Sequence, residues 1–208
     1  MIRFLFFATV LLLFYACKPV PDSKKEHNGL VHFPFQTILI LPLNDADTSG
    51  IAFIQKALAD SFAVPVKVLP ALTIPSSAWY APRKRYWADS VLTWMKTFSG
   101  TDRSVVLGVT GKDISTTTER QSNWGIMGLA YKPGNVCVVS DYRLQKHGIT
   151  PEHIRAKLLK VALHELGHAC GLPHCKQKNC LMTDAEGKEN LDKQKHYCNS
   201  CRSIFFSS

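Results

Sequence analysis

Three histidines and a glutamate in the last quarter of the chain have the spacing of a metal site with its own base. His164, Glu165, His168, Gly171 and His174 fit the pattern H-E-x-x-H-x-x-G-x-x-H. On an α-helix, His164 and His168 lie one turn apart on the same face, so their imidazole nitrogens can converge on one ion. Gly171 allows the helix to end through a left-handed residue, and the turn would bring His174 back as a third ligand. The spacing therefore predicts a zinc site with three neutral ligands and one open position.

An open position on zinc is typical of a hydrolytic site. Zinc lowers the pKa of a bound water from about 15.7 to roughly 7, and a neighbouring carboxylate can accept the proton as the oxygen attacks a carbonyl. Glu165 follows His164 directly and is the candidate base. The competing interpretation is a pair of core histidines satisfied by hydrogen bonds, and it explains neither Glu165 nor Gly171 nor His174.

Four cysteines downstream form two short-spaced pairs separated by a loop. They are Cys175, Cys180, Cys198 and Cys201. Such pairs commonly gather four thiolates around a structural zinc. Two disulfides are the alternative, and they gain weight if the chain is exported to an oxidising compartment. Cys137 and Cys170 have no partner at ligand spacing, so we expect them to be small buried apolar residues.

The histidine pattern and the residues that follow it resemble the archaemetzincins, a family of metzincin zinc metallopeptidases. That family is marked by H-E-x-x-H-x-x-G-x-x-H-C-x4-C-x-M and a later C-x-x-C, which this chain matches in order from His164 to Cys201. The resemblance implies a catalytic zinc at the histidines and a structural zinc at the cysteines. It also implies that Met182 lies in a Met-turn beneath the imidazoles as an apolar floor and not as a ligand. The alternative for Met182 is an ordinary core methionine.

The N-terminus has the layout of a bacterial lipoprotein signal. Arg3 precedes an apolar stretch, residues 4–16, that is shorter than the roughly 20 residues of a membrane span. The residues before Cys17 resemble a lipobox, and residues 17–29 are polar and proline-containing, as in a flexible tether. These features predict removal of residues 1–16 and lipidation of Cys17. The expected location is then a bacterial membrane, with the protein exported and facing the periplasm or the cell exterior.

Residues 30–208 remain for one domain with a core of its own. Apolar strands alternate with amphipathic helices, which predicts the order βαβαβ and parallel strand pairing. The predicted strands are residues 37–43, 64–69 and 104–109. The first helix is expected to start after Thr48 or Ser49 as N-cap. The second is expected to start near Pro82, with a core face made of Trp87, Val91, Trp94, Met95 and Phe98.

A hairpin and a long helix should complete the domain. Residues 124–131 and 136–140 flank a Pro133-Gly134 turn, which predicts a β-hairpin. The resemblance implies that residues 125–131 form an edge strand that binds an extended peptide antiparallel, although an ordinary sheet strand fits the same residues. Thr150 and Pro151 suit the N-cap and first position of a helix that runs to about Cys170 and carries the histidines.

The fold class that these elements indicate is α/β, in the form of a metzincin-like domain. We expect a mixed, mostly parallel twisted sheet, an active-site helix and a small Cys-rich C-terminal subdomain. Its function would be zinc-dependent hydrolysis of peptide bonds, by a monomer acting on peptide or protein substrates.

Two other functions remain open: a non-catalytic zinc-binding lipoprotein that binds peptides in the same cleft, and a membrane-anchored scaffold without metal. Glu165 argues against the first, since a structural site needs no base. The net charge of +9 is scattered along the chain, and no run of interleaved aromatic and basic residues lies near the cysteines. The sequence therefore argues against nucleic acid as a partner.

Overall fold

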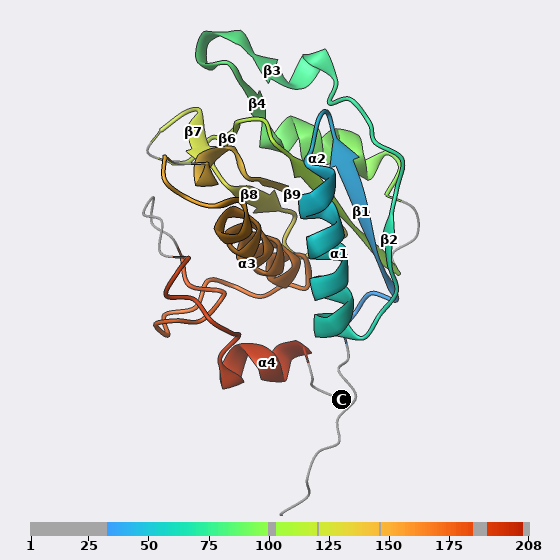
Figure 1. Ribbon diagram of the computed structural model, residues 1–208, viewed down its shortest axis with the longest axis vertical. Helices are drawn as coiled ribbons and strands as arrows, with labels where there is room; N and C mark the ends of the chain where they lie inside the picture. The colour runs from blue at the N-terminus through green and yellow to red at the C-terminus, as the bar shows by residue number, and fades with distance from the viewer. Residues whose placement is uncertain (1–32, 100–102, 120, 146, 185–190, 206–208) are drawn as a thin grey trace, which may run out of the picture.

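A five-stranded sheet forms the centre of the protein, with helices on both faces (Figure 1). The computed structural model describes residues 33–205 apart from 100–102, 120, 146 and 185–190. The strand order is β2-β1-β5-β9-β8. The strands are β1 (Thr37–Leu43), β2 (Val66–Val68), β5 (Ser104–Thr110), β8 (Gly128–Ala130) and β9 (Val136–Ser140). β1, β2, β5 and β9 pair in parallel, and only β8 is antiparallel to its neighbour. This confirms the expected mixed, mostly parallel sheet.

The central strands are apolar on both faces because both faces are covered. In β1, Ile38 and Ile40 point into the core under two helices, and Leu41 and Leu43 point into a second core on the opposite face. Side chains alternate between the two sides of a strand, so a strand with two cores reads as one continuous apolar run. The three strands predicted within residues 37–109 all lie in this sheet and pair in parallel, as expected. Two short strands that were not predicted, Trp79–Tyr80 and Arg85–Trp87, lie between the second and third of them and pair antiparallel in a separate sheet.

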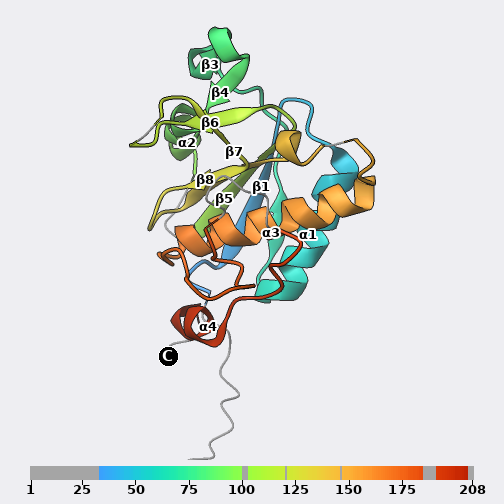
Figure 2. The same ribbon diagram turned by 90° about the vertical axis from the view of Figure 1, so that its left-hand side faces the viewer.

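Two helices cover one face of the sheet and a third covers the other (Figures 1 and 2). α1 (Thr48–Phe62) and α3 (Pro151–Ala169) share the larger core, and α2 (Ala88–Lys96) packs in the smaller one. The side chain of Asp47 caps α1 by accepting from the N–H groups of Ser49 and Gly50, so the N-cap is Asp47 and not Thr48 or Ser49 as predicted. Thr150 caps α3 by accepting from the N–H of His153. The predicted start of the active-site helix is thus confirmed.

A smaller sheet in the order β3-β4-β6-β7 lies above the central one in Figure 1. Its strands are β3 (Trp79–Tyr80), β4 (Arg85–Trp87), β6 (Ile114–Thr116) and β7 (Trp124–Ile126). Short 3-10 turns occupy Ser76–Ala78, Ala81–Arg83 and Tyr142–Leu144. β7 is an edge of the small sheet and β8 is an edge of the large one. Residues 124–130 therefore follow the edge of both sheets in succession.

Three predicted elements differ from the structure. The second helix starts at Ala88 and not near Pro82. Pro82 lies in a 3-10 turn, and Trp87 is the last residue of β4, which precedes the helix. The predicted strand over residues 64–69 is shortened to β2, since Pro65 has no N–H to donate. The predicted arm over residues 124–131 is divided between β7 and β8. Val91 and Met95 are buried as expected, whereas Phe98 is exposed.

The C-terminal segment packs against α3 beside the sheet and ends in α4 (Asn199–Phe205). The hydroxyl of Tyr197 donates to the carbonyl of Leu163, and the ammonium of Lys160 donates to the carbonyl of Leu191. A main-chain bridge joins Cys180 to His196. These contacts place the four cysteines close to the C-terminal half of α3.

The α1 cap gives a first test of the fold. Replacing Asp47 by Ala removes the acceptor for two helix N–H groups and should cost about 1 kcal/mol, or a fall of roughly 2–4 °C in Tm for a protein of this size. The hydroxyl of Ser49, followed by the helix N–H groups, lowers the pKa of Asp47. The stabilisation should therefore persist above about pH 4 and disappear as the pH falls through the lowered pKa.

The matched control is Asp60→Ala on the same helix, where the carboxylate makes an exposed pair with Lys56. Solvent screens such an exposed pair, so this variant should stay close to wild type in urea and thermal unfolding. Equal losses in both variants would contradict the capping role.

Candidate metal centres and active-site cleft

The structure brings His164, His168 and His174 together in a group that could hold a metal ion. One ligand atom from each side chain lies within 4.8 Å of the others. His164 and His168 lie one turn apart on α3, and their ring centroids are 4.6 Å apart. After α3 the chain turns at Gly171, which has φ of +92°, and returns with His174 4.8 Å from the ring of His168. The grouping predicted from the sequence is thus observed.

Oxygen atoms contact the Nδ1 atom of each imidazole. Nδ1 of His164 lies 2.7 Å from the carbonyl oxygen of Leu181, and Nδ1 of His168 lies 2.7 Å from that of Leu172. A carbonyl only accepts, so both Nδ1 atoms carry the proton. Nδ1 of His174 lies 3.2 Å from a carboxylate oxygen of Asp184. These contacts leave Nε2 as the free nitrogen, which is how metal-ligating histidines are usually oriented.

The surroundings of His164 and His168 favour neutral imidazoles. Burial, with repulsion from His164 and His174, lowers the pKa of His168 to about 4. Burial also lowers the pKa of His164, and its hydrogen bond to Leu181 opposes this only in part. Metal binding requires unprotonated nitrogen, so these rings are already in the competent state at neutral pH.

Glu165 is buried between α3 and the edge strand. Only 6% of its surface is exposed, and this burial raises its pKa to about 8. A Cβ added at Gly128 of β8 would lie 2.6 Å from Oε1 of Glu165. The carboxylate therefore lies directly against the backbone of β8. A cation held by the three histidines would attract the carboxylate and lower its pKa again.

Met182 is fully buried next to the active-site helix. A Cβ at Gly167 would collide with its sulfur atom, so the absence of a side chain at Gly167 lets the thioether approach α3 between the two histidine turns. Leu181, whose carbonyl contacts His164, precedes it in the chain. Met182 is therefore next to the histidine group.

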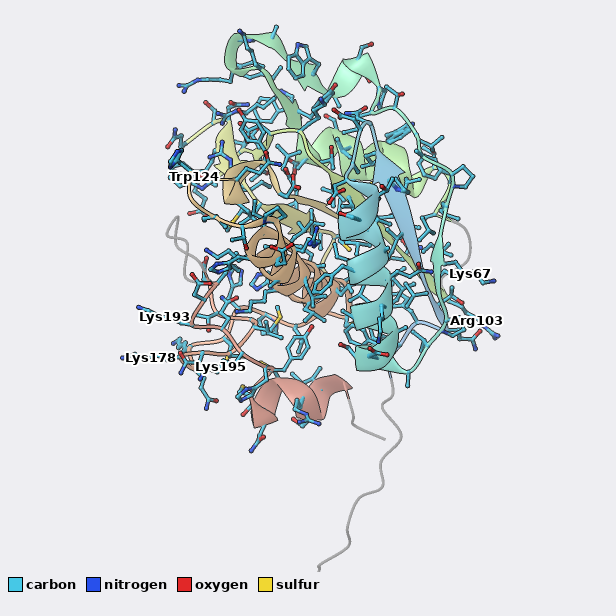
Figure 3. The ribbon with its side chains drawn as sticks, in the orientation of Figure 1. Lys67, Arg103, Trp124, Lys178, Lys193 and Lys195 are labelled. Carbon is cyan, nitrogen blue, oxygen red and sulfur yellow. The ribbon has the colours of Figure 1, made fainter. Side chains whose placement is uncertain are left out.

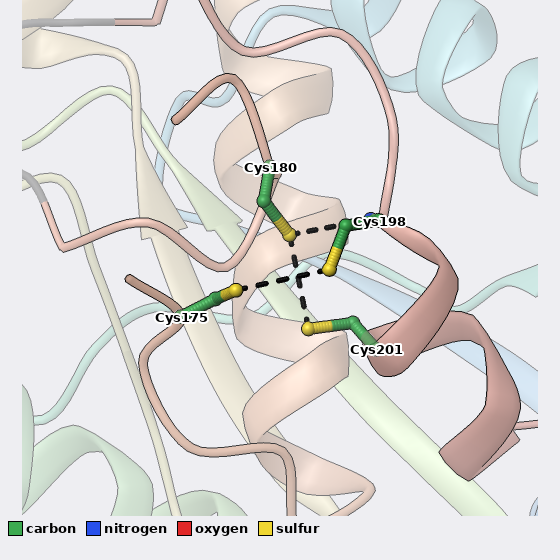
Figure 4. A group of neighbouring side chains, drawn as sticks. All are labelled: Cys175, Cys180, Cys198 and Cys201. Atoms are coloured by element: carbon green, nitrogen blue, oxygen red, sulfur yellow. Dashed lines mark hydrogen bonds between the residues drawn. The ribbon is translucent and has the colours of Figure 1, made fainter. Parts of the chain in front are cut away.

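Four thiols of the C-terminal segment meet near α3 (Figure 4). The ligand atoms of Cys175, Cys180, Cys198 and Cys201 lie within 4.8 Å of one another. Their closest sulfur pairs are 3.7 and 3.8 Å apart, well beyond the disulfide bond length of about 2.05 Å, and all four are free.

Backbone N–H groups point at these sulfurs, as expected around thiolates. The N–H of Met182 and that of Cys198 donate to Cys180, and the N–H of Gln177 donates to Cys175. Donation from the backbone of Cys201 lowers the pKa of Cys198 to about 7, whereas burial raises the pKa of Cys180 and of Cys201. A group of four sulfurs that accepts hydrogen bonds from backbone N–H groups suits a closed tetrahedral zinc site. Cys137 and Cys170 lie outside it, Cys137 buried as expected and Cys170 partly buried.

Several residues of the site were missed by sequence reasoning. At Gly128 and Gly125 the missing side chain leaves room for Glu165 and Arg143, respectively. An isolated glycine within a strand pattern is the sequence signal that could have indicated such a close approach. Arg143 reaches across Gly125 to Asp113, and Asp184 contacts His174. Nothing in the local sequence identifies these last contacts, since each joins residues that are ten or more positions apart and not on one helix or strand. Cys17 lies outside the described residues.

Comparison with known proteins assigns the chain to a family. The model of "Peptidase family M54" matches residues 53–205. A protein named archaemetzincin from Methanocaldococcus jannaschii is 30% identical over 169 residues, which covers 79% of this chain and 89% of that protein. An archaemetzincin from Haloquadratum walsbyi is 28% identical over 175 residues, which covers 80% of this chain and 98% of that protein.

Solved structures agree with this assignment. The crystal structure of archaemetzincin from Archaeoglobus fulgidus, complexed with malonate, superposes with a TM-score of 0.70 at 30% identity and covers 81% of this chain and 99% of that one. Archaemetzincin from Methanopyrus kandleri gives a TM-score of 0.68 at 26% identity, covering 82% of this chain and 93% of that one. The predicted metzincin-like α/β fold class is confirmed.

The prediction of an exported bacterial lipoprotein is wrong by these comparisons, because the relatives that match are archaeal archaemetzincins. The prediction depended on residues 1–17, which lie outside both the described residues and the part matched by the family model. Within the described part of the chain, no helix combines the length and apolar content needed to cross a bilayer.

Family model, relatives and solved structures thus agree with the geometry of the three histidines. The chain belongs to peptidase family M54, the archaemetzincins, and is a zinc metallopeptidase.

Proposed function

We propose that the chain hydrolyses peptide bonds with Glu165 as general base, beside a zinc held by His164, His168 and His174. The observation that carries this is the convergence of three imidazoles whose Nδ1 atoms are all occupied by oxygen partners. A bound zinc would supply Lewis-acid activation of water and of the substrate carbonyl. The donor set fits such an ion, since three neutral nitrogens leave a position for substrate.

Glu165 moves the proton in this proposal. Its carboxylate would accept a proton from the attacking water and then deliver it to the leaving amine. The enclosure by Gly128 and α3 supports this role, because it holds the carboxylate in one place and excludes bulk water. A purely structural metal site would have no use for a buried carboxylate beside it.

The free edge of β8 is proposed to bind the substrate backbone. β8 pairs only with β9 among the described strands, and its Gly128 lies against Glu165. A peptide added antiparallel to β8 would form main-chain hydrogen bonds and present its carbonyl groups next to that carboxylate. The proposed catalytic domain is residues 30–208. Within it, the four cysteines are proposed to hold a second, structural zinc.

The first experiment replaces Glu165 by Gln. We expect zinc content to stay unchanged and the hydrolysis rate of a peptide library to fall by at least about 100-fold, because the amide cannot accept the proton. The matched control is Glu152→Gln, an exposed glutamate on the same helix that pairs with Arg155. It should leave the rate unchanged. Full activity in the Glu165→Gln protein would rule out this mechanism.

A second variant, Gly128→Ala, tests the position of the carboxylate. The new methyl would push Glu165 away from its place on β8, and displacements near 1 Å can cost about 100-fold in rate. We expect kcat to fall by about 10- to 100-fold with zinc retained. Gly111→Ala is the control, since a Cβ there meets Oδ1 of Asp141 at 3.6 Å, an ordinary contact. A Gly128→Ala enzyme as fast as the control would show that the strand does not position the base.

Elemental analysis of the full chain measures the metal content. We expect about two zinc ions per chain, one for each group. A Cys198→Ser and Cys201→Ser double variant should lose one of them and unfold at a lower temperature, because a structural zinc contributes to folding free energy. Cys170→Ser, which removes a thiol outside the cluster, should keep both. Retention of both ions by the double variant, or disulfides in the native protein, would contradict the cysteine site.

A further inference from the structure

An ion cluster with an unbalanced positive charge lies beside the edge strands. Asp113 is only 7% exposed and receives two arginines. Its carboxylate oxygens lie 2.8 Å from Nε of Arg143 and 3.0 Å from Nε of Arg85, and Nη2 of Arg143 donates to it at 3.0 Å. Two guanidinium groups against one carboxylate leave a formal charge of plus one. Asp113 therefore holds Arg143 in place without neutralising the cluster.

Arg143 is the member of the cluster that solvent reaches. Its side chain is 33% exposed, compared with 15% for Arg85. Within the part of the chain that the structure describes, no partner is recorded for Nη1 of Arg143, whereas Nη1 of Arg85 donates to the carbonyl of Asn123. A guanidinium that is fixed through one edge and open along the other is preorganised for a second anion.

The open guanidinium lies on the path of the proposed substrate. A Cβ at Gly125 of β7 would overlap Arg143, so the guanidinium lies directly on the strand backbone. The neighbouring Trp124 is exposed at the rim of the molecule (Figure 3). Gly125 precedes Gly128, the contact of Glu165, by three residues, or about 10 Å along an extended chain. Residues 124–130 follow the edges of the two sheets in succession, so an extended ligand on this edge would pass both points.

The direction of the peptide decides which part of it meets Arg143. In an antiparallel arrangement on β8, the substrate runs from the Ala130 end toward the Gly125 end. The residues that follow the cleaved bond then lie near Arg143, at the second or third position after it. We propose that Arg143 is a subsite residue that binds a carboxylate there, either an acidic side chain or the free C-terminus of a short peptide. This inference rests on the proposed function, since it assumes that peptides bind along this edge.

Binding to a protein that cannot cleave tests the recognition directly. The zinc-loaded Glu165→Gln protein would be titrated with alanine-rich octapeptides capped at both ends, which carry one Glu or one Gln at the same position. A third peptide without the acidic residue would be compared as free acid and as C-terminal amide. We expect about fivefold to tenfold tighter binding for Glu over Gln, and for acid over amide if the C-terminus reaches the site. The ratio should shrink in 0.5 M NaCl because the arginine is partly exposed.

Variants separate recognition from a structural role of the cluster. Arg143→Gln in the same background should bring the Glu to Gln ratio close to one while leaving the affinity for the Gln peptide nearly unchanged. Arg143→Lys keeps the charge and should keep most of the ratio. Arg103→Gln removes one positive charge on the opposite side of the molecule (Figure 3) and should leave the ratio as it was. Equal weakening of both peptides by Arg143→Gln would mean that Arg143 only holds the strands together, and would overturn the proposal.

The position of the carboxylate is read from cleavage by the wild-type enzyme. Mass spectrometry of the products should place Glu at the second or third residue after the cleaved bond. A preference before the bond, or no Glu preference in binding, would refute the proposal even if peptides are hydrolysed. If the wild-type protein cleaves no peptide, the proposed function fails, and the binding ratio still decides whether Arg143 recognises carboxylates.

Discussion

The hydrogen bonds from two imidazoles to main-chain carbonyls are the contacts on which the active-site geometry depends. His168 donates to Leu172 just after the end of α3, and His164 donates to Leu181 in the returning segment. Both carbonyls must be held in place, because a ring that rotates would no longer direct Nε2 to the common point. The turn at Gly171 holds the carbonyl of Leu172 in place, because the N–H of Gly171 donates to the carbonyl of His168 and the N–H of Leu172 donates to that of Gly167.

The second carbonyl depends on the cysteine cluster. Cys180, Leu181 and Met182 are consecutive, and each serves a different contact: a sulfur in the cluster, a carbonyl on His164 and a thioether against Gly167. His174 and Cys175 are likewise adjacent, one in each ligand group. The two groups thus share two short segments of backbone. A disturbance of the cysteine cluster would be transmitted to the histidines through these segments, because so few residues separate them.

Electrostatics and the edge of the sheet act on the same carboxylate. Burial against β8 disfavours the ionised form of Glu165, while a cation at the histidines favours it. A nearby cation is thus what allows a buried carboxylate to act as a base at neutral pH. Asp113 ties together three segments, since its arginine partners come from β4 and from the turn after β9, and Arg143 lies across β7. The ion cluster thus lies against β7, while β8, the strand beside Glu165, is held by its pairing with β9.

The sequence by itself determined the family resemblance, the fold class and the cap of α3, because these depend on local spacing, periodicity and helix-start chemistry. It also indicated the histidine group, since two of the three histidines lie on one helix and the third follows one glycine turn later. Local patterns misled where tertiary context decided. The apolar residues after Pro82 predicted a helix, although Trp87, the first of them, lies in β4. Residues 124–131 predicted one strand, although they form β7 and β8 in two different sheets. The apolar N-terminus, read alone, led to the wrong cellular location.

Only the tertiary structure brought Gly128 to Glu165, Leu181 to His164, and Arg85 and Arg143 to Asp113. These partners are separated by between 17 residues, for Leu181 and His164, and 37 residues, for Gly128 and Glu165, and no local pattern indicates contacts over such separations. They form because separate strands and helices are packed around shared cores, which is a property of the whole chain.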